Sequence, residues 1–343
     1  MRHTHRLRVG VAVCASVLLV GASAVAMAAV MAKPDAGVIS AGAFPDALAI
    51  SPNGRTLYVA DDNAPAANGL VWSLNLATGR KGPAIRVTGP AFLLAIKPNG
   101  HVLYVTNGQV ITPIDLASGR TEAPIRPRLA PGPNSLPILM GRGGRTLYIA
   151  WDARIRRYNL ASGRFGANIP ASLPVAMLLS RNGAVLWYAT FYKEVIAVDL
   201  ATGKVKMRVK LKAQPVALAL TPDGRTLYVA VSGTGKARHP AEVVPINAVT
   251  GVTGAGIAIH DPVALAMAPD GRKLYVLASP PGSEGDGPTV RGWVTPITLA
   301  TRTAGHPRPV GYNPVAIAIT PDGKTLYVAN EDSGTISVIP TRR

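Results

Sequence analysis

The sequence is poor in cysteine, in aromatic residues and in acidic residues. Its 343 residues include one Cys and only 5% Phe, Trp and Tyr, and 18 Asp and Glu oppose 36 Lys and Arg, which gives a formal net charge of +18. One cysteine excludes an intrachain disulfide framework. The 35 Gly and 30 Pro break helical periods too often for a bundle of long helices. Because the apolar fraction is an ordinary 48%, the chain is not a disordered tail either.

The N-terminus predicts a targeting segment. A basic head that contains Arg2, Arg6 and Arg8 precedes an uncharged apolar run, 9–32, in which 26–28 (AMA) provides a small-x-small cleavage motif. We expect a secretory signal over 1–32, cleaved near 28 to 32, and a secreted or extracytoplasmic protein. An uncleaved membrane anchor is the alternative, because about 20 apolar residues span a bilayer. Cleavage would remove Cys14 and three arginines but no acid, leaving a net charge of +15 on the remaining chain.

Seven copies of one pattern fill the rest of the sequence. They are SPNGRTLYVA (51–60), KPNGHVLYVT (97–106), GRGGRTLYIA (141–150), SRNGAVLWYA (180–189), TPDGRTLYVA (221–230), APDGRKLYVL (268–277) and TPDGKTLYVA (320–329). Their turn glycines, Gly54 to Gly323, are spaced by 39 to 52 residues. This period is typical of a four-stranded β-propeller blade of about 40 to 45 residues.

A second marker follows the first by about twenty residues. It reads NLATG, DLASG, NLASG, DLATG and NAVTG, ending at Gly79, Gly119, Gly163, Gly203 and Gly251, and TLATR ends at Arg302. Both markers are turn sequences that supply positive φ. Each repeat therefore predicts strand a, a turn, strand b, a loop, strand c, a second turn and strand d.

The two ends of the repeat array complement each other. The seventh repeat stops after strand c, and the strand-like segment 36–41 precedes the first repeat without partners of its own. We expect 36–41 to complete the last blade, because this closes the ring and removes an open sheet edge. The prediction is an all-β protein: one seven-bladed propeller domain of four-stranded antiparallel blades over 33–343.

A tetrapeptide of strand b stands at 104–107 (YVTN), with near copies at 58–61 (YVAD) and 327–330 (YVAN). With this tetrapeptide and the second marker at a fixed offset, the chain resembles the YVTN family of bacterial β-propeller repeats. The resemblance implies a secreted or cell-surface seven-bladed propeller. It implies no single catalytic signature, and related folds include lactonases and propeller subunits of periplasmic dehydrogenases.

Residues repeated in every blade are predicted to be structural. One aromatic stands four positions after each turn glycine, and we expect blade-to-blade packing from Tyr58, Tyr104, Tyr148, Trp187, Tyr228, Tyr275 and Tyr327. A proline is predicted to open each strand a: Pro45, Pro90, Pro137, Pro174, Pro215, Pro262 and Pro314.

The topology sorts the connections onto two faces. The a–b and c–d turns share one, which we call the turn face. The b–c loops and the d–a crossings share the other, the variable face, where binding residues are expected. There the candidate ligand-binding residues are Asp46, Asp61, Asp62, Trp151, Asp152, Tyr192, His239, His260, Asp261, Tyr312, Asn313, Asn330 and Glu331. The partner would be a protein, a glycan or a small molecule.

Basic residues follow most turns and predict a positively charged turn face. They are Arg55, Arg145, Arg225, Arg272, Lys273 and Lys324 after the first marker, and Arg80, Lys81, Arg120, Arg164, Lys204 and Arg302 after the second. An anionic envelope polymer is one candidate partner, and ordinary solvation is the other explanation. Nucleic acid is disfavoured, because aromatic residues are not interleaved with the cations.

The sequence contains no motif for a catalytic centre, a phosphate loop or a metal site. His239, His260 and Asp261 could form a metal or acid–base site, and the acids at 61–62 and 331–332 could attract a cation. Ordinary solvation of loop residues is the preferred explanation for both sets, because no ligand spacing is recognisable. We predict no cofactor, no metal and no catalytic residue. The expectation is a monomeric, non-enzymatic binding module, and the alternative is a lactonase-like hydrolase or a dehydrogenase-associated propeller.

Overall fold

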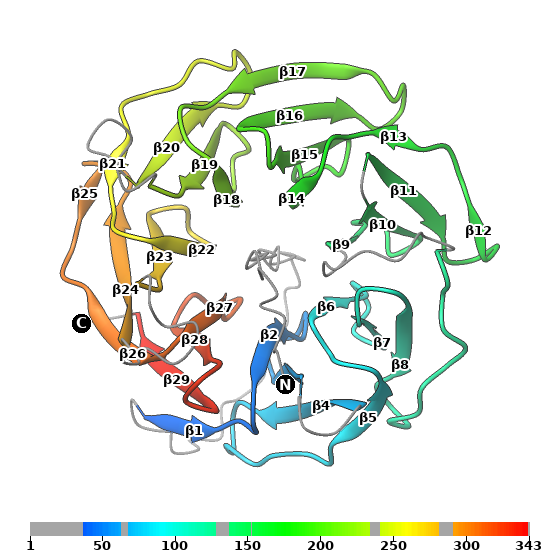
Figure 1. The fold of residues 1–343 in the computed structure, drawn as a ribbon. Helices are drawn as coiled ribbons and strands as arrows, with labels where there is room; N and C mark the ends of the chain where they lie inside the picture. Colours follow the sequence, from blue (N-terminus) through cyan, green and yellow to red (C-terminus); the bar gives the residue numbers. More distant parts are fainter. Residues whose placement is uncertain are drawn as a thin grey trace, which may run out of the picture.

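A computed structural model shows seven antiparallel sheets arranged as blades around one axis (Figure 1). The structure describes residues 37–62, 68–127, 137–151, 153–233, 241–280 and 291–341. The predicted signal segment lies outside these residues. The described ranges contain no helix with the length and apolar character needed to cross a bilayer.

The blades follow one another along the chain. Blade 1 contains β2 (Pro45–Ile50), β3 (Thr56–Asp61), β4 (Asn68–Asn75) and β5 (Ile85–Thr88); blade 2 contains β6 (Leu93–Ile96), β7 (Val102–Thr106) and β8 (Ile111–Asp115). Blade 3 contains β9 (Ile138–Met140), β10 (Thr146–Trp151), β11 (Arg154–Asn159), β12 (Arg164–Phe165) and β13 (Ile169–Pro170). Blade 4 contains β14 (Pro174–Leu179), β15 (Val185–Thr190), β16 (Glu194–Asp199) and β17 (Val205–Lys210).

The remaining blades repeat this plan. Blade 5 contains β18 (Pro215–Leu220), β19 (Thr226–Val231), β20 (Glu242–Asn247) and β21 (Ile257–Ala258). Blade 6 contains β22 (Pro262–Met267), β23 (Lys273–Ala278), β24 (Arg291–Thr298), β25 (Thr303–Ala304) and β26 (Arg308–Tyr312). Blade 7 contains β27 (Pro314–Ile319), β28 (Thr325–Asn330) and β29 (Thr335–Pro340), with β1 (Val38–Ser40) as its outer strand.

The N-terminal strand closes the ring, as predicted. Ile39 of β1 pairs with Ile336 of β29 in antiparallel register, and the amide of Ala41 donates to the carbonyl of Gly334 over 2.7 Å. Gly334 has φ +58, and a Cβ there would lie 2.4 Å from the carbonyl oxygen of Gly42. The last and first blades therefore meet at a joint that has no room for a side chain at Gly334.

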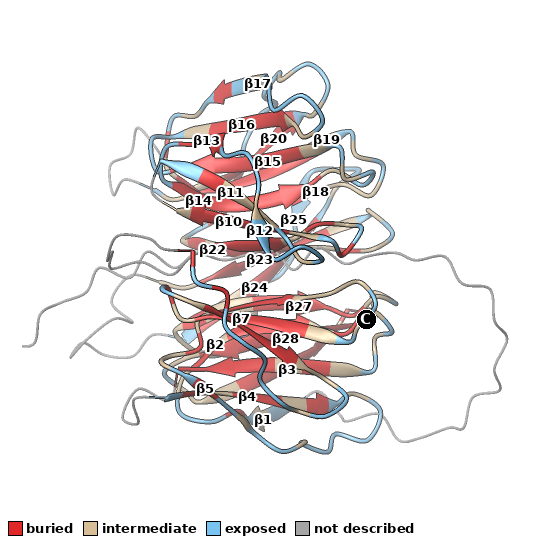
Figure 2. Ribbon diagram, turned by 90° about the vertical axis from the view of Figure 1, so that its right-hand side faces the viewer, coloured by how far each residue is buried: buried red, intermediate tan, exposed pale blue. Residues whose placement is uncertain are grey.

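Backbone hydrogen bonds confirm the two faces. On the turn face, the amide of a c–d turn residue in blades 1 to 6 donates to a carbonyl of the a–b turn of the same blade, as from Leu76 to Arg55 over 2.8 Å and from Ala248 to Arg225 over 2.8 Å. On the opposite face, b–c loops donate to d–a crossings, as from Phe191 to Leu173 over 3.0 Å. In Figure 2 the variable face is on the left and the turn face on the right, and buried strands fill the space between them.

The core lies between adjacent blades and consists of small and branched apolar residues. Strand a contributes alanine, valine and leucine, as in β18, and strand b contributes the repeated aromatic residue. Six of the seven aromatics are buried, and Tyr58 is half-buried. The predicted packing role of these residues is confirmed.

Two predicted strand openings are wrong. Pro90 and Pro137 lie outside strands, because β6 begins at Leu93 and β9 at Ile138, whereas the other five prolines do begin strand a. Those five are followed by a β-bulge, as between Pro45 and Ala47. Pro90 stands ten residues before its turn glycine and Pro137 seven, instead of nine, so neither reaches the bulge position. Blade 2 also departs from the plan, since its fourth strand is reduced to isolated bridges at Thr121 and Ile125.

Candidate binding face

Three crossings on the variable face have a strained backbone. Leu173, Asp261 and Asn313 adopt φ of 43°, 43° and 45°, and each immediately precedes the proline that begins strand a. Left-handed conformations cost a residue with a Cβ about 1 to 2 kcal/mol. Their carbonyls accept amide hydrogens from the first residue of a b–c loop, namely Phe191, Ser279 and Glu331. Two of the predicted ligand residues, Asp261 and Asn313, thus occupy positions that the fold holds under strain.

Blade 7 brings four predicted residues together. The Nδ2 atom of Asn313 donates to Glu331 over 3.1 Å and to Asp332 over 3.3 Å, and the amide of Tyr312 donates to Ser333 over 2.6 Å. Asn330 is fully buried, and its Oδ1 accepts from the amide of Gly311 over 3.0 Å. Asn313 and the acidic loop therefore form one polar network, whereas Asn330 supports it from beneath.

The carboxylate of Asp61 in blade 1 holds the backbone of the preceding crossing. Asp61 is 2% exposed, and its two oxygens accept the amides of Ala43 over 3.1 Å and Phe44 over 3.0 Å. Asp62 is also buried, and its amide donates to the carbonyl of Phe44 over 3.0 Å. Asp46 is half-buried at the bulge of β2. The equivalent position in β14, β18, β22 and β27 is a valine. These interactions give Asp61 a structural task that the sequence pattern did not indicate.

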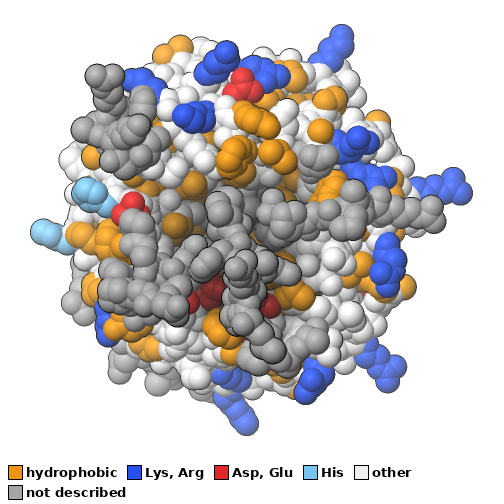
Figure 3. All heavy atoms as spheres, viewed as in Figure 1, with side chains coloured by type: hydrophobic (Ala, Val, Ile, Leu, Met, Phe, Trp, Pro, Cys, Tyr) orange, Lys and Arg blue, Asp and Glu red, His pale blue; other side chains and the backbone are white. Residues whose placement is uncertain are grey.

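Blade 4 presents an apolar rim. Tyr192 is 61% exposed, Phe191 45% and Leu173 37%. The rings of Phe191 and Tyr192 lie edge to face, with centroids 6.0 Å apart. Lys193, next to them, has φ of 63°. Figure 3 views this face and shows hydrophobic side chains on the surface over blade 4.

The other predicted residues are dispersed. Trp151 is half-buried at the end of β10, and His260 is exposed after β21. Tyr312 pairs with Arg291, whose guanidinium lies 5.3 Å from the tyrosine ring centroid. Asp152 and His239 lie outside the described residues, as do large parts of the loops at 232–242 and 279–291. In the part of the chain that the structure describes, no three His, Cys, Asp or Glu side chains are arranged to hold a metal ion.

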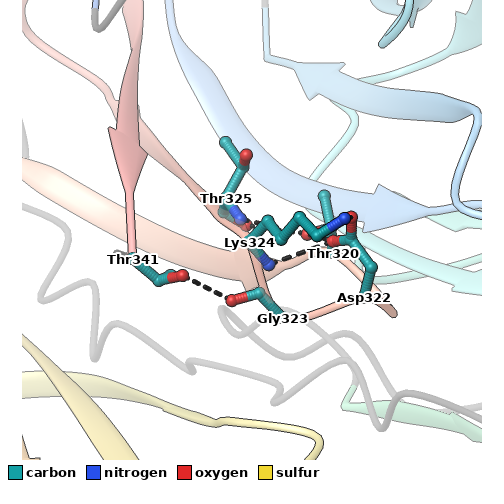
Figure 4. A network of polar contacts seen from close by, with 6 residues as sticks. All are labelled: Thr320, Asp322, Gly323, Lys324, Thr325 and Thr341. Atoms are coloured by element: carbon teal, nitrogen blue, oxygen red, sulfur yellow. Dashed lines mark hydrogen bonds and ion pairs between the residues drawn. The ribbon is translucent and has the colours of Figure 1, made fainter. Parts of the chain in front are cut away.

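Polar turns stabilise the opposite face. In Figure 4 the hydroxyl of Thr320 donates to Asp322 over 2.5 Å, and Thr341, near the end of the chain, donates to the carbonyl of Gly323 over 2.5 Å. Burial acts to raise the pKa of Asp322, but hydrogen bonds from Thr320 and from the amide of Lys324 leave it below its ordinary value. The same hydroxyl-to-Asx bond recurs at Ser51, Ser180 and Thr221. The uniform turns are therefore repeated structural units.

Positive charge is concentrated in two of the seven blades. The turn-following cations are exposed except Lys273, which is half-buried. However, residues 137–214, which form blades 3 and 4, contain thirteen Lys and Arg and three Asp and Glu, a net of +10 out of the +15 beyond residue 28. Figure 3 shows cations along the rim near β11, β16 and β17. The signal for this concentration is the alternating run at 204–212, KVKMRVKLK, of which only Lys204 directly follows a turn marker.

The comparisons with known proteins support the fold. Among solved structures, the chain is similar to hydrazine synthase from Kuenenia stuttgartiensis, with a TM-score of 0.72 and 20% identity over 90% of this chain and 97% of that chain. Comparisons with protein-family models and with curated proteins returned no match, so the resemblance to YVTN repeats is not confirmed by them. The class that fold and comparison define together is the seven-bladed β-propeller.

Proposed function

We propose that this chain is an extracytoplasmic propeller of the YVTN-repeat type that works as a non-enzymatic binding module, with its ligand on the variable face. The observation that supports this most is that the buried and the exposed side chains of that face have different roles. Buried polar side chains such as Asp61 and Asn330 hold backbone, whereas Phe191, Tyr192 and Leu173 stay exposed on a rim. Exposed aromatic side chains beside polar groups are typical of binding surfaces.

The ligand contacts on this proposal come from several blades. Tyr192 provides an aromatic surface, His260 and Asp261 provide polar groups at the blade 6 crossing, and Tyr312 with Asn313 does so at blade 7. A rigid ring can present loops from different blades to one partner. The partner class is a component of the cell envelope, and the protein binds it as a monomer.

The test measures binding of the full chain to isolated cell envelopes of the producing organism. Changing Phe191→Ser and Tyr192→Ser together is expected to weaken binding about tenfold, since each aromatic contributes about 0.5 to 1.5 kcal/mol beyond its area. The matched control is Val249→Ser with Val252→Ser, two valines that are 77% and 67% exposed on the turn face. Equal weakening by the control would overturn the assignment of the face. Hydrolysis of homoserine lactone or γ-valerolactone that is lost in His260→Ala would overturn the non-enzymatic function.

A further inference from the structure

The outer strand of blade 4 carries an unbroken alternation of cations. Along β17 and its flanks the cations alternate with Val205, Met207, Val209 and Leu211, and they are Lys204, Lys206, Arg208, Lys210 and Lys212. All five are exposed. At about 3.4 Å per residue, the row spans about 27 Å of surface. Val209 is buried and Met207 half-buried against blade 5, so these two side chains anchor the strand. Val205 is 51% exposed and lies beyond a register shift in the pairing of β17 with β16.

This charge belongs to blade 4 in particular. The outer strands β1, β5, β12, β13, β21, β25 and β26 carry at most one Lys or Arg each. A lysine on an edge strand discourages edge-to-edge pairing, and one such residue is enough for that purpose. Arg208 contacts Glu194 at 2.5 Å, and within the described ranges the four lysines of the row have no acidic partner at ion-pair distance. The row is therefore an excess of positive charge on one edge.

The exposed aromatic pair lies at one end of the row. Glu194 at the start of β16 is the register partner of Lys210, and the amide of Leu211 donates to the carbonyl of Lys193 over 2.8 Å. Phe191 and Tyr192 directly precede Lys193, so the loop that carries this aromatic pair adjoins the Lys210–Lys212 end of the row. Cations in line, followed by an aromatic ring, match a linear chain of acidic sugars, whose charged groups bind lysines and whose ring faces pack on aromatics.

We propose that the outer edge of blade 4 binds a linear acidic polysaccharide, with its anionic groups along Lys204–Lys212 and one sugar ring on Tyr192. Single-stranded nucleic acid fits less well, because its binding surfaces place aromatic residues under successive bases, and here only aliphatic residues separate the cations. The site extends beyond the proposed ligand face and shares only the aromatic pair with it.

The experiment titrates the full chain with heparin and with polygalacturonate, which distinguish sulfate from carboxylate, and with a dT20 oligonucleotide. The test variant changes Lys204, Lys206, Lys210 and Lys212 to Ser and is expected to raise the Kd for at least one polysaccharide about tenfold or more. Its matched control removes the same charge from the turn face by changing Arg55, Arg120, Arg225 and Arg272 to Ser, with an expected change in Kd of less than about threefold. Tyr192→Phe should preserve polysaccharide affinity, and Tyr192→Ala should weaken it about three- to tenfold.

Four outcomes would overturn the proposal: failure of the wild-type chain to bind either polysaccharide, equal weakening by the control variant, binding that Tyr192→Ala leaves unchanged, or tighter binding of dT20 than of both polysaccharides. A Lys→Arg variant at the same four positions keeps the charge and should restore binding. If the serine variant does not fold, the double change Lys206→Ser with Lys210→Ser is used, with Arg120→Ser and Arg225→Ser as its control. Envelope binding that depends on Phe191 and Tyr192 but not on the lysines would leave the proposed function intact and remove this site alone.

Discussion

The residue at the end of strand b, or directly after it, has a specific task in three blades. It stands seven positions after the turn glycine, and it is Asp61, Asn107 and Asn330 in blades 1, 2 and 7. Asp61 accepts the amides of Ala43 and Phe44, Asn107 donates to the carbonyl of Thr88 over 2.8 Å, and Asn330 accepts the amide of Gly311. Each side chain thus fastens the segment that enters its own blade, which explains the fourth letter of the YVTN tetrapeptide in this chain.

Asn330→Ala is expected to destabilise the fold by about 2 to 3 kcal/mol. The side chain is fully buried and also donates to Ser337 over 3.0 Å, so truncation leaves several buried polar groups without partners. Urea unfolding of the full chain, followed by tryptophan fluorescence, measures the change. Asn168→Ala is the control, because Asn168 is exposed. A decrease in the free energy of unfolding of less than about 0.5 kcal/mol for Asn330→Ala would show that the hydrogen bonds of this side chain contribute little to stability.

Among the strands and turns, the features that repeat in every blade could be predicted from the sequence, whereas the features that differ between blades could not. Turn glycines and a strand-like segment without partners were sufficient to predict the blades and the closure by β1, because tight turns require particular residues. The strain at Leu173, Asp261 and Asn313 could not be predicted, since it depends on how each crossing meets its proline. Nor could the backbone contacts of Asp61 be predicted, because they join the residues before β2 to the end of β3 across a whole hairpin.

Closure by β1 can be tested with proline. The amide of Val338 donates to the carbonyl of Gly37, and the amide of Ala41 donates to the carbonyl of Gly334. Hydrogen-bonded pairs occur at every second residue of an antiparallel ladder, so the amide of Ile39, midway between them, faces its register partner Ile336. Ile39→Pro should therefore remove a ladder hydrogen bond and part of the packing, at a cost of about 2 to 4 kcal/mol. Val38→Pro is the matched control, because Val38 is 68% exposed and its amide points away from β29. Similar losses from both variants in thermal unfolding would argue against a closing role for this strand.

On the scale of the whole molecule, the ring distributes its packing evenly and its charge unevenly. One aromatic per blade lies between sheets all around the axis, whereas blades 3 and 4 hold two thirds of the net charge beyond residue 28. The even part follows from the repeat, since each blade must pack on the next. The concentration of positive charge in blades 3 and 4 has no role in closing the ring, which is why we associate it with a binding partner.

The buried tyrosines should make the protein sensitive to alkali. Burial raises the pKa of Tyr58, Tyr148, Tyr188, Tyr228, Tyr275 and Tyr327, and burial together with Glu122 and Tyr158 raises the pKa of Tyr104 to about 12. The unfolded chain releases these protons near pH 10, while the folded chain keeps them. The stabilisation that these buried phenols contribute is therefore fully present below about pH 10. It is lost as the pH rises toward the pKa values that the phenols have in the folded chain.

We expect the free energy of unfolding to fall by more than about 1.4 kcal/mol per pH unit above pH 10, because more than one proton is released on unfolding. Urea unfolding of the full chain at pH 8, 10, 11 and 12 measures it. Tyr104→Phe should reduce the slope, since one buried phenol no longer titrates. Val249→Ser should leave it unchanged, because it changes an exposed residue that has no titratable group. A flat profile to pH 12, or an equal effect of both variants, would mean that the packed phenols titrate as they do in water.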